Sequence, residues 1–358
     1  MSARVAVVGL GLIGGSIALA ARERLQAEVA GFDRCAEALD GALARGAISR
    51  RCASVADALA DAQAAFVAVP VGALPDVIAT ALQAAGEDCV VTDVGSTKRA
   101  VVASQSDPRF VGGHPLAGAE TSGIEHARED LFDGATWYLT PTALTAGVLY
   151  ERLHRMLIGL GARPAAIDAE THDTILATVS HLPHVLANVL VAQAARRLAD
   201  GDERLPATGP SFRDCTRVAG APSGIWTDVY LSNADALSAE IEDTITRLGE
   251  VRDALRTGDG GRIAAWNDRA ATDHRRLLES QLASGPLFEL RASVPNRPGV
   301  IAQLALELGR AGVNIADLAL YPAADRSDGV VALWVAGEPA AQRTEELVAR
   351  LGYPVARA

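Results

Sequence analysis

Three patterns of apolar and polar residues follow one another along the chain. Up to about residue 165, short apolar runs of the length of buried strands alternate with helical stretches, which predicts an α/β domain with a mainly parallel sheet. From 166 to 284 the strand signals stop and apolar residues recur at helical spacing, which predicts an all-α helical domain. From 285 to 358 strand and helix signals alternate again. We therefore expect three domains, 1–165, 166–284 and 285–358.

The first apolar run, Val5–Val8, leads into Gly9-Leu10-Gly11-Leu12-Ile13-Gly14 and then into a helical stretch, Ile17–Leu25. A second run, Glu28–Asp33, ends in a carboxylate. This order of strand, G-x-G-x-x-G, helix, strand and acid is the Rossmann-like dinucleotide-binding pattern, in which the glycines let the backbone approach a pyrophosphate. A glycine turn in an ordinary α/β unit is the weaker alternative, because it does not account for the complete pattern.

The carboxylate of Asp33 stands where it would accept hydrogen bonds from the adenosine ribose and repel a 2′-phosphate, so we expect NAD rather than NADP. Arg34 beside it would weaken that preference. A further buried-strand run, Ala65–Pro70, would bring its last residues to the same edge of the sheet. The candidate cofactor-binding residues are Gly9, Gly11, Leu12, Ile13, Gly14, Asp33, Arg34, Val69, Pro70 and Ser96.

Two candidate catalytic residues follow later strands of the first domain. Ser96 lies in the turn after the run Cys89–Val94, where it could cap the next helix or belong to an active site; the two roles are compatible and both stay open. The stretch Gly112–Glu120 has no apolar period, so we expect a loop that holds His114 between two flexible glycines and Pro115. From this stretch alone, a plain turn and a catalytic imidazole are equally well supported.

The helical domain contains Ser180-His181-Leu182-Pro183-His184. His181 and His184 share one helix face, and Pro183 should kink the helix. The two histidines could bind a metal, lie in a core or contact a substrate. A metal site would need further ligands such as His172 and Asp173, and no HExxH pattern is present, so we expect no metal.

A second cluster in the helical domain is Asp214-Cys215-Thr216-Arg217, in which Asp214 and Arg217 could pair on one helical face. Apolar flanks such as Phe212 and Val218 suggest that the segment is partly buried. An arginine held by an aspartate suits a substrate carboxylate. Long helices are expected from Trp226 to Thr257 and from 261 to 282, and their apolar stripe predicts a homodimer.

The last 72 or so residues predict the order βαββαβ, a ferredoxin-like plan. They contain no catalytic cluster, which suits a ligand sensor or a dimerisation unit. The whole chain of 358 residues has a net charge of −11, which argues against nucleic acid or an anionic membrane as the main partner. Four scattered cysteines, no export signal and no uninterrupted apolar run approaching 18 residues predict a cytoplasmic protein without a membrane span.

Taken together, these motifs resemble those of the prephenate dehydrogenase family with a C-terminal ACT domain, over nearly the whole chain. The motifs that carry the resemblance are Gly9-x-Gly11-x-x-Gly14, Asp93-x-Gly95-Ser96-x-Lys98, Gly113-His114-Pro115-Leu116-Ala117-Gly118-x-Glu120, Ser180-His181-Leu182-Pro183-His184 and Asp214-x-x-Arg217. The resemblance implies NAD-dependent oxidative decarboxylation of prephenate to 4-hydroxyphenylpyruvate in tyrosine biosynthesis. Because no chorismate mutase domain precedes Met1, the bifunctional type is not expected.

The resemblance also implies roles for single residues. His114 would accept the proton of the substrate's C4 hydroxyl, and Ser96 would help to orient it. Arg217, oriented by Asp214, would bind a substrate carboxylate, and His181, His184 and Glu120 match further pocket positions. The segments Pro298-Gly299 and Gly312–Ile315 resemble an ACT effector site, at which tyrosine could bind.

Three other functions compete with this interpretation. Arogenate dehydrogenase has the same chemistry with an amino group in the substrate. A β-hydroxyacid dehydrogenase should carry a catalytic lysine on the long helix of the second domain, whereas the only lysine here is Lys98. A non-catalytic sensor of an amino acid and NAD would not need the His114, Ser96 and Arg217 motifs.

Overall fold

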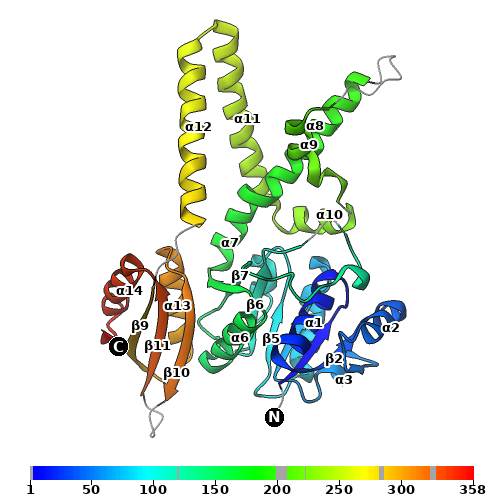
Figure 1. Cartoon of the computed structure of the whole chain (residues 1–358), viewed down its shortest axis with the longest axis vertical. Coiled ribbons are helices and arrows are strands. Elements are labelled where there is room, and N and C mark those ends of the chain that lie inside the picture. Colours follow the sequence, from blue (N-terminus) through cyan, green and yellow to red (C-terminus); the bar gives the residue numbers. More distant parts are fainter. Residues whose placement is uncertain (1–2, 119–120, 199–207, 222, 282–285, 323–327) are drawn as a thin grey trace. The chain divides into compact units, whose positions relative to one another are not determined.

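The computed structural model describes residues 3–118, 121–198, 208–221, 223–281, 286–322 and 328–358 (Figure 1). The chain forms two compact units. The first consists of Met1–Asp173, Gly220–Ser232 and Leu287–Ala358, and the second of Thr174–Ala219 and Asn233–Pro286. The C-terminal segment therefore packs with the α/β part of the chain, although the helical segment separates the two in the sequence.

An eight-stranded sheet forms the centre of the first unit, in the order β3-β2-β1-β4-β5-β6-β7-β8. All neighbouring strands are parallel except β6 and β7, which are antiparallel. The order reverses between β1 and β4, the position at which doubly wound sheets bind ligands beyond the carboxyl ends of their strands. The strands are β1 (Arg4–Val8), β2 (Glu28–Phe32), β3 (Arg50–Arg51), β4 (Ala64–Val67), β5 (Val90–Asp93), β6 (Phe110–Pro115), β7 (Thr136–Thr140) and β8 (Arg163–Ala166).

Helices cover both faces of this sheet, because alternate residues of its central strands point to opposite sides. In β1, Val5 and Val7 belong to one apolar core, and Ala6 and Val8 belong to the other. The α/β prediction for the first part of the chain is thus confirmed. The helices are α1 (Leu12–Leu25), α2 (Ala36–Ala44), α3 (Val55–Leu59), α4 (Leu74–Ala84), α5 (Arg99–Ala103) and α6 (Gly147–Gly159), with short 3-10 turns η1 (Val71–Ala73) and η2 (Ile124–His126).

The loop expected around His114 is instead the end of a buried strand. β6 continues through Pro115, and His114 pairs with Tyr138 of the antiparallel strand β7. The preceding glycines provide room rather than unusual backbone angles, since neither has a positive φ. A Cβ on Gly113 would lie 2.7 Å from the carbonyl oxygen of Asp93, so a larger residue would push the strands apart. The expected loop was wrong because its strand partner, β7, is distant in the sequence.

The helical segment runs from α7 to α12. The predicted helix from Trp226 to Thr257 is interrupted at Asn233, a fully buried residue that precedes the second piece without a side-chain capping hydrogen bond. The elements are α7 (Ala169–Leu176), the π-helix η3 (Ala177–His181), α8 (Leu182–Leu198), α9 (Pro210–Thr216), the 3-10 turn η4 (Arg217–Gly220), α10 (Ser223–Ser232), α11 (Ala234–Thr257) and α12 (Gly260–Gln281).

The proline in the long helix causes a widened turn rather than a break. Pro183 cannot donate a backbone hydrogen bond, and the chain takes up the mismatch in the π-helix η3 just before it. The sequence predicted no membrane span, because no apolar run approaches 18 residues without a charge or turn signal. Because the helix continues, Ala169–Arg196 is, by length and composition, one helix of the described residues that could cross a membrane. Its buried His181 and His184 suit a helix that packs against protein, since such groups are costly in lipid.

Large apolar side chains of the second unit remain exposed in the single chain. They lie on α8, α11 and α12 and on the π-helix. A set of this size on long helices is typical of a surface that another subunit covers. The residues are Val179, Val189, Leu190, Val191, Ile245, Leu248, Leu255, Trp266 and Leu277.

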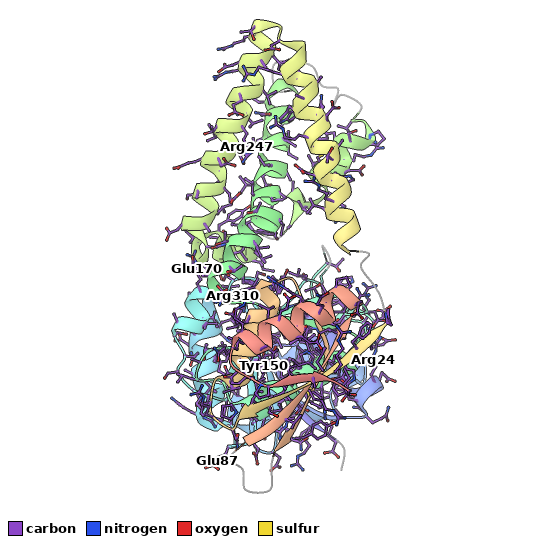
Figure 2. The ribbon with its side chains drawn as sticks, turned by 90° about the vertical axis from the view of Figure 1, so that its left-hand side faces the viewer. Arg24, Glu87, Tyr150, Glu170, Arg247 and Arg310 are labelled. Atoms are coloured by element: carbon purple, nitrogen blue, oxygen red, sulfur yellow. The ribbon has the colours of Figure 1, made fainter. Side chains whose placement is uncertain are left out.

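The C-terminal segment has the predicted order βαββαβ and forms an antiparallel sheet, β10-β11-β9-β12. Arg310, at the end of its first helix, lies 3.4 Å from the carboxylate of Asp168, just before α7 (Figure 2 labels Arg310 and Glu170). Asp168 in turn caps α7 by accepting a hydrogen bond from Thr171 N (2.9 Å). The elements are β9 (Leu287–Pro295), α13 (Val300–Arg310), β10 (Ile315–Pro322), β11 (Asp328–Ala336), α14 (Glu338–Arg350) and β12 (Val355–Arg357).

One buried histidine between these two sheets makes stability depend on pH. His154 of α6 is 1% exposed, and burial lowers its pKa to about 4, although nearby Asp317 of β10 opposes the shift. In the unfolded chain the ordinary value is 6.5, so acid protonates the unfolded state first, and stability falls as pH drops below about that value. Between about pH 7 and pH 5 this group should remove about 2 kcal/mol of unfolding free energy.

Urea unfolding of the His154→Leu variant at both pH values checks this expectation. The loss of stability on acidification should shrink by that amount. The exposed His126 provides a matched control, because its replacement by glutamine should leave the acid sensitivity unchanged. An unaltered pH dependence in His154→Leu would contradict the assignment.

Candidate active site

Two glycines of the turn after β1, Gly9 and Gly14, are packed too tightly for any other residue, whereas Gly11 has open space beside it. Gly9 has φ +95°, and a Cβ on it would collide with the carbonyl oxygen of Ala68 at the end of β4. A Cβ on Gly14 would collide with the carbonyl oxygen of Gly9. Gly11 caps α1 without a side-chain hydrogen bond, and the first turn of α1 has no acidic residue. The first turn therefore presents backbone N–H groups and a positive dipole end, which suits a phosphate.

Asp33 follows β2 at the same edge of the sheet. Its carboxylate accepts hydrogen bonds from the backbone amides of Leu10 (2.6 Å) and Cys35 (2.8 Å), which fix its orientation beside the glycine turn. Leu12 and Ile13 are half-buried and begin α1, while Arg34 is exposed. After β4, Val69 is half-buried and Pro70 exposed. The predicted cofactor residues thus gather at the carboxyl ends of β1, β2 and β4, with Ser96 after the next strand, β5.

A buried ion pair shapes the next strand end. Lys98 and Asp93 are both fully buried and form a short ion pair. Asp93 also accepts hydrogen bonds from the amides of Gly95 (2.8 Å) and Gly113 (3.0 Å). Burial lowers the pKa of Lys98, and the attraction of Asp93 opposes that shift. The pair therefore ties the loop after β5 to the strand that carries His114.

Ser96 is half-buried in this loop and does not cap α5. The cap comes from Asp173 of α7, whose carboxylate accepts hydrogen bonds from the amides of Lys98 (2.7 Å) and Arg99 (2.9 Å). Of the two roles left open for Ser96, the helix cap is therefore wrong, and a role at the sheet edge remains a prediction.

His114 is 8% exposed, and its ring contacts a residue that the sequence argument did not select for catalysis. Its Nδ1 lies 2.9 Å from Nε2 of His172, and Nδ1 of His172 lies 2.7 Å from Oδ1 of Asp173. His172 and Asp173 had been considered only as metal ligands. The signal that could have found them is their position, an adjacent His-Asp pair on the helix that follows the last strand of the sheet.

The two histidines of the helical unit are buried and each contacts an asparagine. The distance from Nδ1 of His181 to Nδ2 of Asn233 is 3.2 Å, as is that from Nδ1 of His184 to Nδ2 of Asn188. Because an amide NH₂ only donates, each Nδ1 accepts, and the ring proton belongs on Nε2. Burial lowers the pKa of His184, so its ring is neutral. Within the described ranges, no group of three or more His, Cys, Asp or Glu could hold a metal ion.

Asp214 and Arg217 are less buried than the sequence suggested. Both are exposed, and only flanking residues such as Phe212 and Val218 are half-buried. α9 ends before Arg217, which begins a 3-10 turn, so the two residues do not share one regular helix. In the described part of the chain, Asp214 forms no ion pair. The apolar flanks misled the argument because α9 is only seven residues long. Glu120 lies outside the described residues.

Comparisons with known proteins agree with this architecture. The family model for the prephenate dehydrogenase nucleotide-binding domain matches residues 17–165, and that for the prephenate dehydrogenase dimerization domain matches residues 168–267. A prephenate dehydrogenase of Bacillus subtilis is 31% identical over 365 residues, which cover 99% of this chain and 98% of that protein.

Solved structures give the same result. A prephenate dehydrogenase of A. aeolicus, in complex with hydroxyphenyl propionate and NAD+, has a TM-score of 0.72 at 26% identity and covers 77% of this chain and 99% of its own. An arogenate dehydrogenase of Synechocystis has a TM-score of 0.66 at 26% identity, with 76% and 99% covered. The extent of the sequence matches, over both matched domains and nearly the full length of a curated relative, shows that the chain belongs to the prephenate dehydrogenase family.

Proposed function

We propose that the chain is an NAD-dependent prephenate dehydrogenase, which converts prephenate to 4-hydroxyphenylpyruvate and CO2 in tyrosine biosynthesis. One observation carries the proposal beyond family membership. His114 is a buried imidazole near the end of β6. The glycine turn and Asp33 follow β1 and β2 of the same sheet, and they lie at the same edge of that sheet as His114. A nucleotide cradle and a candidate base at one sheet edge are the parts that a dehydrogenase needs.

The chain's own residues fit NAD, and the bound nicotinamide supplies the hydride acceptor. Gly11 leaves open space for a pyrophosphate, since a Cβ on it would have no other atom within 4 Å, and the start of α1 presents N–H groups to the charge of that pyrophosphate. Gly9 and Gly14 let the turn pack closely on itself and on the residue after β4. The carboxylate of Asp33 suits the ribose hydroxyls. Leu12, Ile13, Val69 and Pro70 would flank the cofactor from neighbouring strand ends.

The reaction needs a base that removes a proton and groups that bind the substrate. When prephenate loses CO2 and a hydride, its ring becomes aromatic, so the driving force lies in the substrate. His114 would take the proton of the C4 hydroxyl, as a neutral imidazole can near pH 7. Ser96 would hold that hydroxyl or the imidazole. Arg217 would bind a substrate carboxylate, and the remaining candidates for substrate contacts are His181, His184, Asp214 and Glu120.

The direct test follows NADH absorbance with NAD and either prephenate or arogenate. We expect turnover with prephenate and a lower KM for NAD than for NADP, because Asp33 repels a 2′-phosphate. The Asp33→Ser variant should narrow that difference between the cofactors. Faster turnover of arogenate would favour the amino substrate, no signal with either substrate would favour a sensor, and a lower KM for NADP would refute the cofactor preference.

We also propose that the chain is a homodimer through its helical unit. The exposed apolar residues of α8, α11 and α12 support this, as does the match to a dimerization domain. Light scattering on the purified protein tests it, and a monomer would contradict it.

The four cysteines are free, which suits the reducing cytoplasm.

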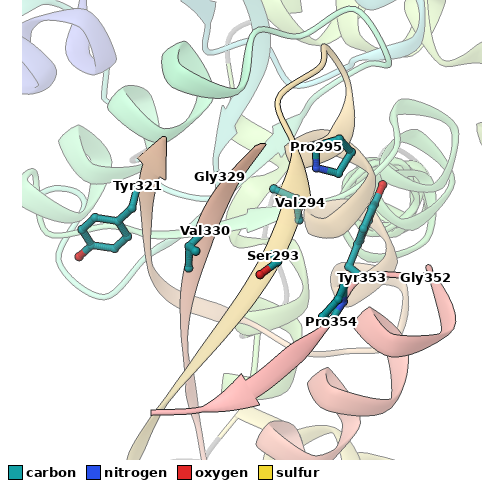
Figure 3. Close-up of a pocket in the computed structure, with 9 residues that line it drawn as sticks. All are labelled: Ser293, Val294, Pro295, Tyr321, Gly329, Val330, Gly352, Tyr353 and Pro354. Atoms are coloured by element: carbon teal, nitrogen blue, oxygen red, sulfur yellow. The ribbon is translucent and has the colours of Figure 1, made fainter. Parts of the chain in front are cut away.

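We propose further that residues 285–358 form an ACT domain that binds an effector amino acid, tyrosine. The βαββαβ order and the antiparallel sheet support this. A hollow of about 610 Å³ lies at one end of that sheet, lined by residues such as Ser293, Tyr321 and Tyr353 (Figure 3). The segments that resemble an effector site, Pro298-Gly299 and Gly312–Ile315, do not line this hollow; Pro298 and Gly299 line another, of about 380 Å³. Initial rates with and without tyrosine test the idea, and rates that tyrosine leaves unchanged would count against it.

A further inference from the structure

His114 ends a continuous chain of hydrogen-bonding groups within the first unit. From His114 on β6 the contacts lead through His172 to Asp173, both on α7, at distances of 2.9 and 2.7 Å. His172 and Asp173 are fully buried. Asp173 also holds the first amides of α5, so backbone and side-chain contacts together fix its carboxylate.

The direction of these hydrogen bonds follows from the protonation states. Burial alone would raise the pKa of Asp173, but the bonds from His172 and from the Arg99 and Lys98 amides outweigh it and hold the pKa low. Burial lowers the pKa of His172, and although Asp173 opposes this, the ring is neutral near pH 7. A carboxylate only accepts, so His172 donates from Nδ1 and accepts at Nε2. His114 must then donate from its Nδ1.

We propose that His172 and Asp173 are positioning residues for the proposed dehydrogenase reaction, and that they fix His114 in the tautomer whose Nε2 carries the lone pair. In the reaction, the O–H bond of the substrate hydroxyl breaks and an N–H bond forms at Nε2 of His114. The Nδ1 proton stays between His114 and His172. The positive charge that His114 gains is stabilised through His172 by the anionic Asp173.

Other titratable and aromatic groups surround His172 and act on its ring. Tyr138 of β7 meets the His172 ring edge-on, with ring centroids 5.6 Å apart. The charges of Lys98 and Asp93 on the β5 side act on it in opposite directions. Asp173 is the charged group in direct hydrogen-bond contact with the ring. The groups that face His172 are His114, Tyr138, Lys98, Asp93 and Asp173.

The test compares Asp173→Asn with Glu170→Gln, which removes an exposed carboxylate from the same helix. For Asp173→Asn we expect kcat to fall on the order of 10–100-fold, the scale for an outer partner that fixes a histidine, with KM for prephenate unchanged. The acidic limb of the kcat–pH profile should move to lower pH by about one unit, because the charge on His114 is less stabilised. Glu170→Gln should match the wild type.

A second pair of variants separates positioning from packing. His172→Gln can still accept from His114 and donate to Asp173, whereas His172→Leu can do neither. We therefore expect the glutamine variant to keep clearly more activity than the leucine variant. Equal losses in the two, or a kcat loss in Asp173→Asn without movement of the acidic limb, would overturn the positioning role.

A readout without substrate keeps this inference separate from the proposed function on which it rests. Among the slowly exchanging imidazole N–H signals in proton NMR of the wild type, one should come from Nδ1 of His172 and one from Nδ1 of His114. Asp173→Asn should lose the first of them. If the wild type failed to oxidise prephenate but showed both signals, the function would be wrong and the hydrogen-bonded chain would stand; absence of both signals would overturn the chain itself.

Discussion

The His114→Asn variant is expected to lose about 10²–10⁴-fold in kcat with prephenate and NAD, with little change in KM for prephenate. Asparagine can fill much of the space of the imidazole and bond to His172, but it cannot take a proton near pH 7. Because the substrate supplies the driving force by becoming aromatic, proton removal is the part of the reaction that the protein must assist. Steady-state rates of NADH formation measure the effect.

His126→Asn is a suitable control for this variant. His126 lies in the same domain with its side chain 47% exposed, and it belongs to none of the motifs assigned to the site. Its replacement should leave kcat at the wild-type value. Turnover of His114→Asn close to that of the wild type would remove His114 from the mechanism.

The Arg217→Ala variant is expected to raise KM for prephenate about 10²-fold, with a smaller change in kcat. Loss of a charged hydrogen-bonding partner for a substrate carboxylate costs about 3 kcal/mol, which corresponds to that factor. KM for NAD should stay the same. Initial rates over a range of prephenate concentrations give both constants.

Arg213→Ala provides the matched control, since Arg213 is an exposed arginine of the neighbouring helix α9 that donates to the carbonyl oxygen of Thr208 (2.8 Å). Its KM for prephenate should equal that of the wild type. An unchanged KM in Arg217→Ala would refute the carboxylate role. A rise of similar size in both variants would indicate a general effect of lost positive charge.

Local patterns predicted most of the fold. The glycine turn and the alternation of apolar runs and helices determined the parallel sheet, because each βα unit is encoded within a short stretch of sequence. The βαββαβ order at the C-terminus followed for the same reason. The extension of β6 through Pro115 was missed, since it depends on pairing with β7, whose residues begin at Thr136. The π-helix was missed as well, because a kink at Pro183 has several possible geometries.

The sequence also predicted part of the candidate site, namely the residues whose motifs directly follow strands. Gly9, Gly14, Asp33 and His114 stand at one edge of the sheet because their motifs follow the strands directly. His172 and Asp173 have no motif, and their importance arises only when α7 packs against the end of β5. The exposure of Arg217 differs from the expectation, because the burial of a short helix such as α9 depends on its neighbours rather than on its own sequence.

Lys98 also affects the chemical labelling of the protein. It is the only lysine of the chain, and in the folded state its amine is fully buried against Asp93. All other positive side chains are guanidinium groups or histidines, which do not react readily with amine-directed reagents. Such a reagent should therefore modify the folded protein at its α-amino group first. A second adduct, at Lys98, can form only when the loop after β5 opens, so the rate at which this adduct appears in mass spectra reports how often the carboxyl edge of the sheet opens locally.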